Sequence, residues 1–140
     1  MSLKRDIKKS LAQKGWDFSF DTNTFLVKNK TLFNKTKEIS YKSNNIITCF
    51  SVHPLENIIA LGTNKGIVEL LLVDIKNKKS YCILQKDCRK DLEKYNLSND
   101  QQAVKCIDWN DAGTECAVAG GKDKKFWYVI CKFEKQQNKN

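Results

Sequence analysis

The sequence lacks the features that mark membrane-spanning, secreted and metal-binding chains. It contains no run of about 18 apolar residues, so we expect no membrane-spanning helix. Residues 1–15 are charged throughout and have no apolar central region, so they do not form a signal peptide. His53 is the only histidine, and any zinc site would therefore depend mainly on cysteines.

The six cysteines do not follow a pattern that binds metal or forms a disulfide framework. Five residues separate Cys82 from Cys88, whereas the pairs in zinc knuckles are two to four residues apart. Without a signal peptide we expect reduced thiols in a cytoplasmic protein, with cytoskeletal, ciliary and nuclear settings as alternatives. Cys49 and Cys106 are predicted to fill core positions as small apolar side chains.

The sequence also carries no enzymatic motif. Residues 120–123 read Gly-Gly-Lys-Asp, without the upstream glycine and the following Ser or Thr of a phosphate-binding loop. Asp108 and Asp111 lie in a predicted turn, where Asp commonly bonds to its own backbone. We therefore predict a protein that is not an enzyme and that has no cofactor and no metal.

What the sequence does contain is typical of one globular domain. Its 140 residues are 41% hydrophobic and 29% charged, which is enough to bury a core. The net charge of +9 favours polyanions, but the lysines are scattered along the chain rather than clustered. Binding of RNA, DNA or an anionic surface through residues 4–14 and 122–125 is therefore the alternative function and not the leading one.

Residues 1–15 are predicted to form a basic amphipathic helix. Apolar residues recur every fourth position, Ser2 can cap the first turn, and Gly15 can take the left-handed conformation that ends a helix. Such a helix can dock on its own or a neighbouring chain, and a membrane surface or a calmodulin-like groove is the alternative. The residues predicted to bind a partner here are Leu3, Ile7, Leu11, Lys8 and Lys9.

Residues 16–44 are predicted to form an irregular β segment. Short apolar pieces at residues 25–27, 31–33 and 38–41 are separated by polar residues. Trp16, Phe18 and Phe20 alternate with polar residues, which indicates one face packed on the domain, with stacking on nucleic-acid bases as the alternative.

Residues 45–86 contain the clearest pattern in the chain. Apolar runs at residues 46–52, 58–61 and 67–73 are separated by two short turns, which predicts an antiparallel meander. A fourth strand is expected at residues 80–84. The polar insertion at residues 87–102 then spaces Leu92, Tyr95 and Leu97 as a short helix would, and we predict that it is a contact surface, with Tyr95 as a candidate anchor.

Residues 103–133 repeat this meander. Ile47 aligns with Val104, 57 residues later, and one extra residue in the following turn aligns Gly62 with Gly120 and Val68 with Phe126. Strands are expected at residues 116–119 and 126–133. An obvious fourth strand is missing from the second copy, because residues 134–140 form a polar tail.

The repeat resembles the WD-repeat β-propeller family over about residues 45–133. The similar segments are residues 50–54 (Phe-Ser-Val-His-Pro), 60–62 (Ala-Leu-Gly) and 73–74 (Val-Asp), then 108–113 (Asp-Trp-Asn-Asp-Ala-Gly), 117–121 (Ala-Val-Ala-Gly-Gly) and 122–123 (Lys-Asp). Neither copy is preceded by Gly-His, and neither ends in Trp-Asp. The structural repeat residues are Pro54, Gly62, Asp74, Gly113, Gly120 and Asp123, and the resemblance implies that Asp123 ties its turn to a neighbouring backbone.

The resemblance implies a mainly β fold of two antiparallel four-stranded propeller-like blades, the second without its last strand, after a short N-terminal helix. Two blades cannot close a ring of four to eight. The chain is then either the start of a larger propeller or a subunit that docks its blades on another protein. We predict a non-enzymatic scaffold or adaptor that mediates protein-protein interactions in a larger complex, where other subunits complete the open propeller. The aromatic anchors predicted for this role are Trp109, Trp127 and Tyr128.

Overall fold

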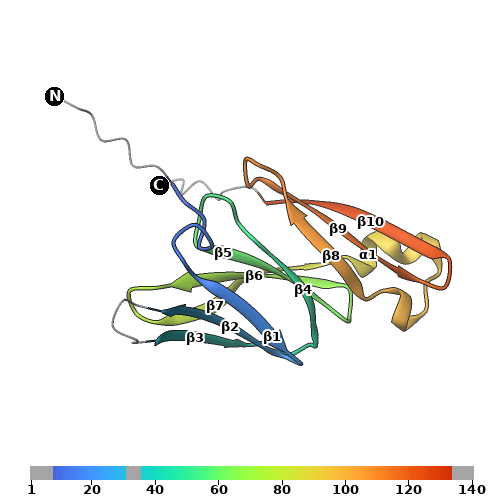
Figure 1. Ribbon diagram of the computed structural model, residues 1–140. Helices are drawn as coiled ribbons and strands as arrows, with labels where there is room; N and C mark the ends of the chain where they lie inside the picture. The colour runs from blue at the N-terminus through green and yellow to red at the C-terminus, as the bar shows by residue number, and fades with distance from the viewer. Residues whose placement is uncertain (1–7, 31–35, 134–140) are drawn as a thin grey trace, which may run out of the picture.

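The computed structural model describes residues 8–30 and 36–133. This part of the chain forms three antiparallel sheets (Figure 1), which confirms the mainly β prediction. The first sheet has the order β1 (Asp17–Asp21), β2 (Thr24–Lys30), β3 (Thr36–Lys42). The central sheet is the predicted meander with its fourth strand: β4 (Ile47–Val52), β5 (Ile58–Thr63), β6 (Ile67–Asp74) and β7 (Lys79–Asp87). The third sheet comprises β8 (Val104–Trp109), β9 (Glu115–Lys122) and β10 (Lys125–Lys132).

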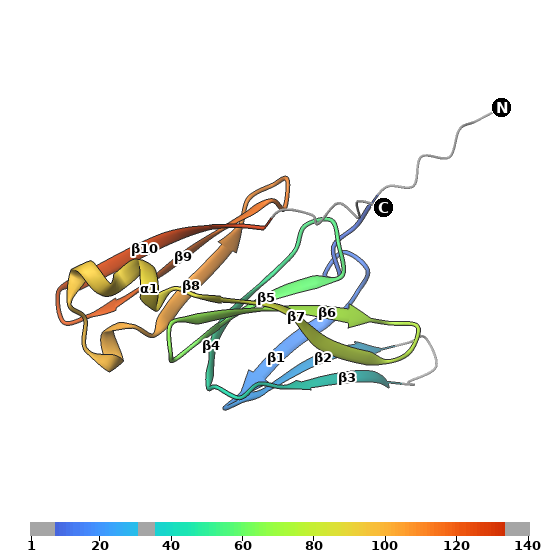
Figure 2. The ribbon, with the colours of Figure 1, turned by 180° about the vertical axis from the view of Figure 1, so that it is seen from behind.

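The central sheet lies between the other two, and apolar residues on both of its faces are buried, whereas its edge strand β7 remains partly exposed (Figures 1 and 2). On β6, Leu71 and Val73 join the cluster shared with the first sheet. The alternate residues Val68 and Leu70 join the cluster shared with the third sheet. Because successive side chains of a strand point to opposite faces, a strand covered on both sides needs apolar residues at consecutive positions. This explains the nearly continuous apolar run of β6.

Two of the hairpins turn through residues with positive φ at Gly66 and at Asp123 and Lys124. Gly66, in the predicted turn between β5 and β6, has φ of +73°. Asp123 and Lys124 connect β9 to β10 with φ of 56° and 69°. Positive φ at both central residues is the geometry of the two-residue turn that matches the twist of a hairpin.

The predicted helix over residues 2–14 is not confirmed. Residues 8–10 have no regular structure and residues 11–15 form a single turn, in which the Trp16 N–H donates to the Leu11 carbonyl at 3.1 Å. Leu11 is fully buried in the cluster between the first and central sheets, and Gly15 takes the expected left-handed conformation with φ of +91°. Burying this one leucine requires a turn and not a continuous helix. Leu3 and Ile7, like the predicted β piece at residues 31–33, lie outside the described residues.

The polar insertion contains three short helical segments, α1 (Arg89–Leu92), η1 (Glu93–Tyr95) and η2 (Asn99–Gln101). Leu92 is buried in the cluster between the central and third sheets, as its helical spacing suggested. Ser98 and Gln101 form a reciprocal capping box that starts η2. The insertion therefore covers one end of the third sheet instead of extending away from it.

Strand pairing supports the internal repeat and corrects its alignment. The register shifts once between Ile47 and Cys49 in β4, and once at the equivalent place in β8, between Val104 and Cys106. Val52 then pairs with Ile59, as Trp109 pairs with Cys116, so the offset of 57 continues through the second strand.

The extra residue predicted in the first turn of the second copy is therefore absent. Cys49 pairs with Gly62 and Cys106 pairs with Ala119, so Gly62 corresponds to Ala119 and not to Gly120. Gly62 pairs with Val68 and Ala119 pairs with Tyr128, so Val68 corresponds to Tyr128 and not to Phe126. The difference arises at the β9–β10 hairpin, where the strands extend further before they turn.

Candidate interaction surface

The third sheet has one covered face and one open face. Trp127, Val118 and Cys116 point toward the central sheet and are buried. On the opposite face, Phe126 and Tyr128 of β10 keep 81% and 75% of their surface exposed, and Ile130 keeps 49%. A row of aromatic and aliphatic side chains therefore runs along β10 on the open face, where the charged residues Asp108 and Lys132 are also exposed.

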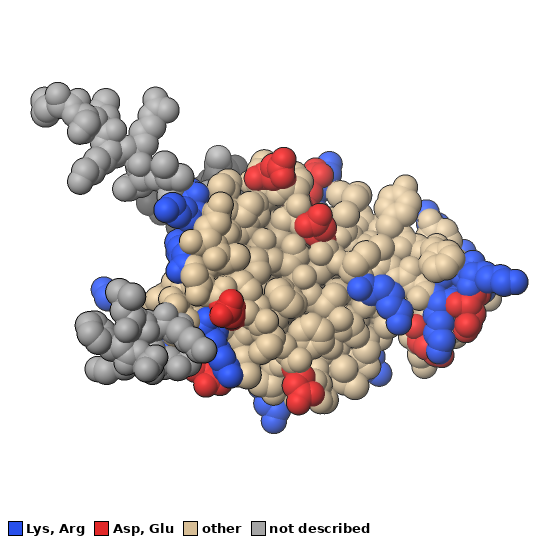
Figure 3. Space-filling model, in the orientation of Figure 1, with Lys and Arg blue, Asp and Glu red and all other residues tan. Residues whose placement is uncertain are grey.

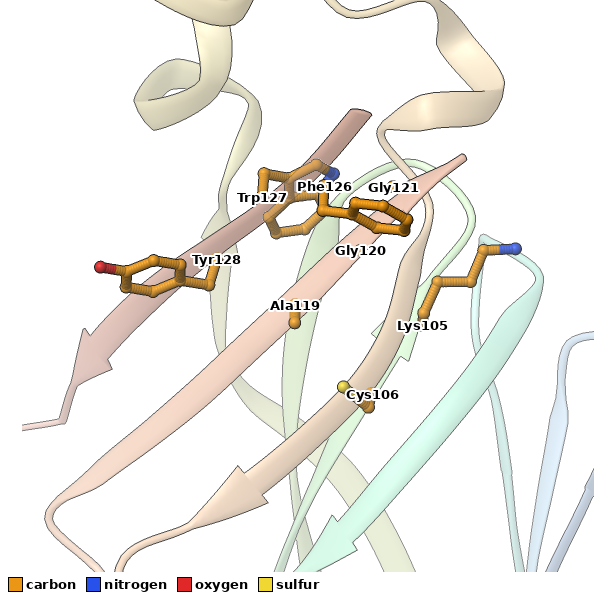
Figure 4. Close-up of a pocket in the computed structure, with 8 residues that line it drawn as sticks. All are labelled: Lys105, Cys106, Ala119, Gly120, Gly121, Phe126, Trp127 and Tyr128. Atoms are coloured by element: carbon orange, nitrogen blue, oxygen red, sulfur yellow. The ribbon is translucent and has the colours of Figure 1, made fainter. Parts of the chain in front are cut away.

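A hollow of about 400 Å³ lies on this open face (Figure 4). Small residues of β8 and β9 form its floor, and aromatic residues of β10 border it. The two glycines cannot be replaced freely, because a Cβ on Gly120 would come within 2.4 Å of the Trp127 ring and one on Gly121 within 2.1 Å of the Lys125 carbonyl oxygen. The lining residues are Lys105, Cys106, Ala119, Gly120, Gly121, Phe126, Trp127 and Tyr128.

The structure separates the three predicted aromatic anchors. Tyr128 is on the open face, whereas Trp109 and Trp127 are only 8% and 4% exposed. The Trp127 indole N–H donates to the Gln101 carbonyl at 2.6 Å, and that of Trp109 donates to the Ser51 carbonyl at 3.0 Å. The two tryptophans thus pack inside the chain, although Trp127 also contributes to the lining of the hollow. Phe126 is not among the predicted anchors, although its place in the row with Tyr128 follows from the period of two in a strand.

His53 connects the central sheet to the third sheet. Its Nδ1 accepts hydrogen bonds from the backbone N–H groups of Leu55 and Glu56, both at 3.0 Å. Nε2 therefore carries the proton, and it donates to the carbonyl of Gly113 at 2.8 Å. The imidazole also packs edge-on against Trp109, with ring centroids 4.6 Å apart. His53 lies in the first of the two predicted short turns, but its bond to Gly113 depends on a residue 60 positions away that no local pattern shows.

Glu69 makes the corresponding connection between the central and first sheets. Its carboxylate is buried and accepts hydrogen bonds from the Tyr41 and Ser43 hydroxyls. Burial, followed by the hydrogen bond to Glu69, raises the pKa of the Tyr41 phenol well above its usual range. The Ser80 hydroxyl adds a bond to the Ser40 carbonyl at 2.8 Å.

The six cysteines are free thiols. Cys88, Cys116 and Cys131 are buried in the cluster between the central and third sheets, and burial raises the pKa of the Cys116 thiol. Cys49 is partly buried, as predicted for a core residue, but Cys106 is exposed and lines the hollow. No group of three or more His, Cys, Asp or Glu residues among the described residues is arranged to hold a metal ion.

Other predicted contact residues are dispersed over the surface. Tyr95 is 48% exposed, with the Lys94 ammonium 5.1 Å from its ring centroid. Lys9 is exposed, and Lys8 forms an ion pair with Glu56 at 2.9 Å. Leu11, predicted to bind a partner, is instead part of the core.

The repeat residues have local structural roles. Pro54 lies in the turn after β4, and Gly113 approaches the His53 ring. The Asp74 carboxylate accepts hydrogen bonds from the side chain and backbone of Asn77, which lower its pKa. Asp123 is exposed at the hairpin tip, and no hydrogen bond joins its side chain to another described residue. The expectation that Asp123 ties its turn to a neighbouring backbone is therefore not confirmed.

Comparison of the sequence with protein-family models and with curated proteins finds no match. None of the helices within the described ranges is both long enough and apolar enough to cross a membrane.

Proposed function

We propose that the protein is a non-enzymatic scaffold or adaptor that binds other protein subunits within a larger assembly. The observation that carries this proposal is the open face of the third sheet, where Phe126, Tyr128 and Ile130 are exposed in one row. Monomeric proteins rarely expose a contiguous apolar patch unless it binds something. Exposed aromatic side chains beside a hollow are typical anchors of protein interfaces.

The stacking of the sheets supports a WD-repeat-like architecture for this scaffold. Consecutive antiparallel meanders pack face to face, and two of them share a strand bulge at equivalent positions. Adjacent blades of a propeller are arranged in this manner. The first sheet, which we had predicted as irregular, packs on the central sheet in a similar way. Three blade-like sheets fall short of a closed ring, and a partner subunit would then complete the stack.

Isolation of the protein from its native source tests this function. We expect it to co-isolate with one or more proteins in a fixed ratio that survives about 0.5 M salt, because apolar contacts resist screening whereas exposed ion pairs do not. A folded protein that runs as a monomer, without a partner in fixed ratio, would contradict the proposal.

Polyanion binding through residues 4–14 and 122–125 has less support. Lys8 is paired with Glu56, and Lys122 lies 3.6 Å from Asp100. In Figure 3, basic and acidic side chains are intermixed at the end where α1 and the β9–β10 hairpin lie. Binding of RNA, DNA or anionic vesicles that weakens steeply above 0.1 M salt would favour this alternative.

A further inference from the structure

The open face of the third sheet is equivalent to a covered face of the central sheet. The corrected repeat alignment places Cys49, Ala60 and Gly62 of the central sheet over Cys106, Ala117 and Ala119 of the third. The same pairing places Val68 and Leu70 over Tyr128 and Ile130. In the central sheet these positions face the third sheet, whereas their counterparts in the third sheet face solvent.

The covered face shows what kind of surface fits such a position. Its band of small residues lets the side chains of β8 approach closely. A Cβ on Gly62 would lie only 2.6 Å from the Val104 Cγ1 atom, so this contact requires glycine. Val104 and Trp109, near the two ends of β8, are both buried against the central sheet. The surface that covers this face is thus a strand with branched aliphatic and aromatic side chains.

The open face repeats this arrangement of small and large residues. Cys106, Ala119 and Gly121 form a band of small residues at the hollow, and Phe126 and Tyr128 stand beside it on β10 (Figure 4). The hollow offers an incoming apolar side chain a place that no described residue fills. Only Lys105 adds a charge to its lining.

A second copy of the chain cannot continue the stack from head to tail. The outward face of the first sheet, which would have to cover the third sheet, exposes Asp17, Lys28, Glu38 and Lys42. Its middle strand β2 presents Thr24, Leu26 and Lys28 outward, with one apolar residue among these three. The strand β8, by contrast, buries three apolar residues against the central sheet, Val104, Ile107 and Trp109. The missing covering sheet must therefore have a different chemistry.

We infer that the open face of the third sheet binds an antiparallel β-sheet of another protein, whose contact strand presents branched aliphatic and aromatic side chains at alternate positions. This inference rests on the proposed scaffold function and names its surface and its class of partner. A side chain of the partner strand then fills the hollow, in the position that Val104 occupies against Gly62 in the central sheet.

Site-specific photo-crosslinking in the native source tests the inference directly. The photoreactive residue p-benzoylphenylalanine replaces Tyr128 in one variant and Tyr81 in a matched control, since Tyr81 is 48% exposed on β7 of the central sheet. We expect position 128, and not position 81, to crosslink to a strand of another protein with alternating apolar residues. Crosslinks only to the third sheet of a second copy, to a helical segment or to no protein would overturn the inference.

A pair of charge substitutions separates this inference from the proposed function. Tyr128→Asp should reduce the co-isolated partner roughly tenfold or more, as expected for a central aromatic anchor, and Tyr81→Asp should not. Both variants should keep the wild-type circular dichroism, because neither side chain is part of the buried core. If the partner is retained by Tyr128→Asp, the inference is wrong and the scaffold function stands. If wild-type protein has no partner, the proposed function itself fails.

Discussion

His53 shows how one side chain connects two sheets. Its imidazole accepts two backbone N–H groups within its own turn and donates to the carbonyl of Gly113 near the third sheet. All of its hydrogen-bonding capacity is used, and the ring is only 6% exposed. A residue placed in this way contributes to stability through both its bonds and its contact with Trp109.

We predict that His53→Ala lowers the free energy of unfolding by about 2 to 4 kcal/mol, because buried bonding partners lose their hydrogen bonds and a cavity forms beside Trp109. Urea unfolding followed by tryptophan fluorescence measures the change. Leu55→Ala is the matched control, since this exposed residue lies in the same turn and should change stability by less than about 1 kcal/mol. Equal effects of the two substitutions would show that His53 is an ordinary turn residue.

Gly113 is required for the same contact. Because Gly113 has φ of +71°, alanine at this position would be strained by about 1 to 2 kcal/mol. The Cβ of this alanine would also lie 2.2 Å from the His53 ring. Gly15→Ala is a matched control, because Gly15 has φ of +91° but its Cβ would meet only Asn29 Oδ1, at 3.9 Å.

We therefore predict a larger loss of stability for Gly113→Ala than for Gly15→Ala, measured by the same urea titration. In the double variant His53→Ala with Gly113→Ala, the two losses should be less than additive, because the first substitution removes the clash. Strict additivity would contradict the proposed contact.

At the scale of elements, the sheets are joined by buried polar contacts that apolar patterning alone does not show. Glu69 points out of β6 toward the first sheet and bonds to Tyr41 and Ser43, in a strand that is otherwise apolar up to its last residue, Asp74. A buried carboxylate is favourable only while its donors remain in place. The first and central sheets are therefore held in a defined arrangement.

This contact predicts a loss of stability at alkaline pH. The pKa of Tyr41 is raised above its unfolded value of about 10, so above that pH the unfolded chain releases a proton that the folded chain retains. The contribution of Tyr41 is then complete below about pH 10 and decreases as pH rises further. Urea titrations between pH 8 and 11 should show this decrease in the wild type and a smaller one in Tyr41→Phe. Tyr81→Phe changes an exposed tyrosine and should lose as much stability as the wild type. If its loss of stability is as small as that of Tyr41→Phe, the assignment of the effect to Tyr41 is wrong.

The strands were predicted best where apolar runs alternate with short turns in the sequence. The three apolar runs of residues 46–73 became β4, β5 and β6, because consecutive apolar residues between short turns leave few other folds. The spacing of Leu3, Ile7 and Leu11 suggested a helix, yet the described part forms a turn, since burial of Leu11 outweighs a weak periodic signal. The burial of Trp109 and Trp127 depends on which face of the third sheet meets the central sheet, and a residue type alone does not reveal this.

At the scale of the whole molecule, three sheets stack in one direction and leave two unlike ends. The outward face of the first sheet exposes charged residues, whereas that of the third sheet exposes Phe126 and Tyr128. The repeat predicted that two similar meanders would be present, but only their pairing register shows which face of the second one lacks a cover. Within residues 8–30 and 36–133, the stack is thus open at the end of the third sheet.

The open face of the third sheet predicts that the isolated chain is poorly soluble and that polar substitutions on this face improve its solubility. Phe126→Ser combined with Tyr128→Ser should raise the concentration at which the purified protein starts to aggregate, because it removes the most exposed aromatic side chains. Light scattering over a concentration series measures this. The control Tyr81→Ser with Tyr95→Ser removes two half-exposed tyrosines elsewhere and should have a smaller effect. If both pairs of substitutions raise the aggregation concentration equally, aggregation depends on general surface hydrophobicity and not on the open face of the third sheet.

Hydroxyl-radical footprinting of the protein, alone and in the assembly isolated from its native source, tests most directly whether a partner covers the open face of the third sheet. The account predicts that oxidation of Phe126 and Tyr128 decreases several-fold in the assembly, while oxidation of Tyr81 is unchanged. If Phe126 and Tyr128 are oxidised equally in both samples, the open face of the third sheet is not covered by a partner and the account is wrong.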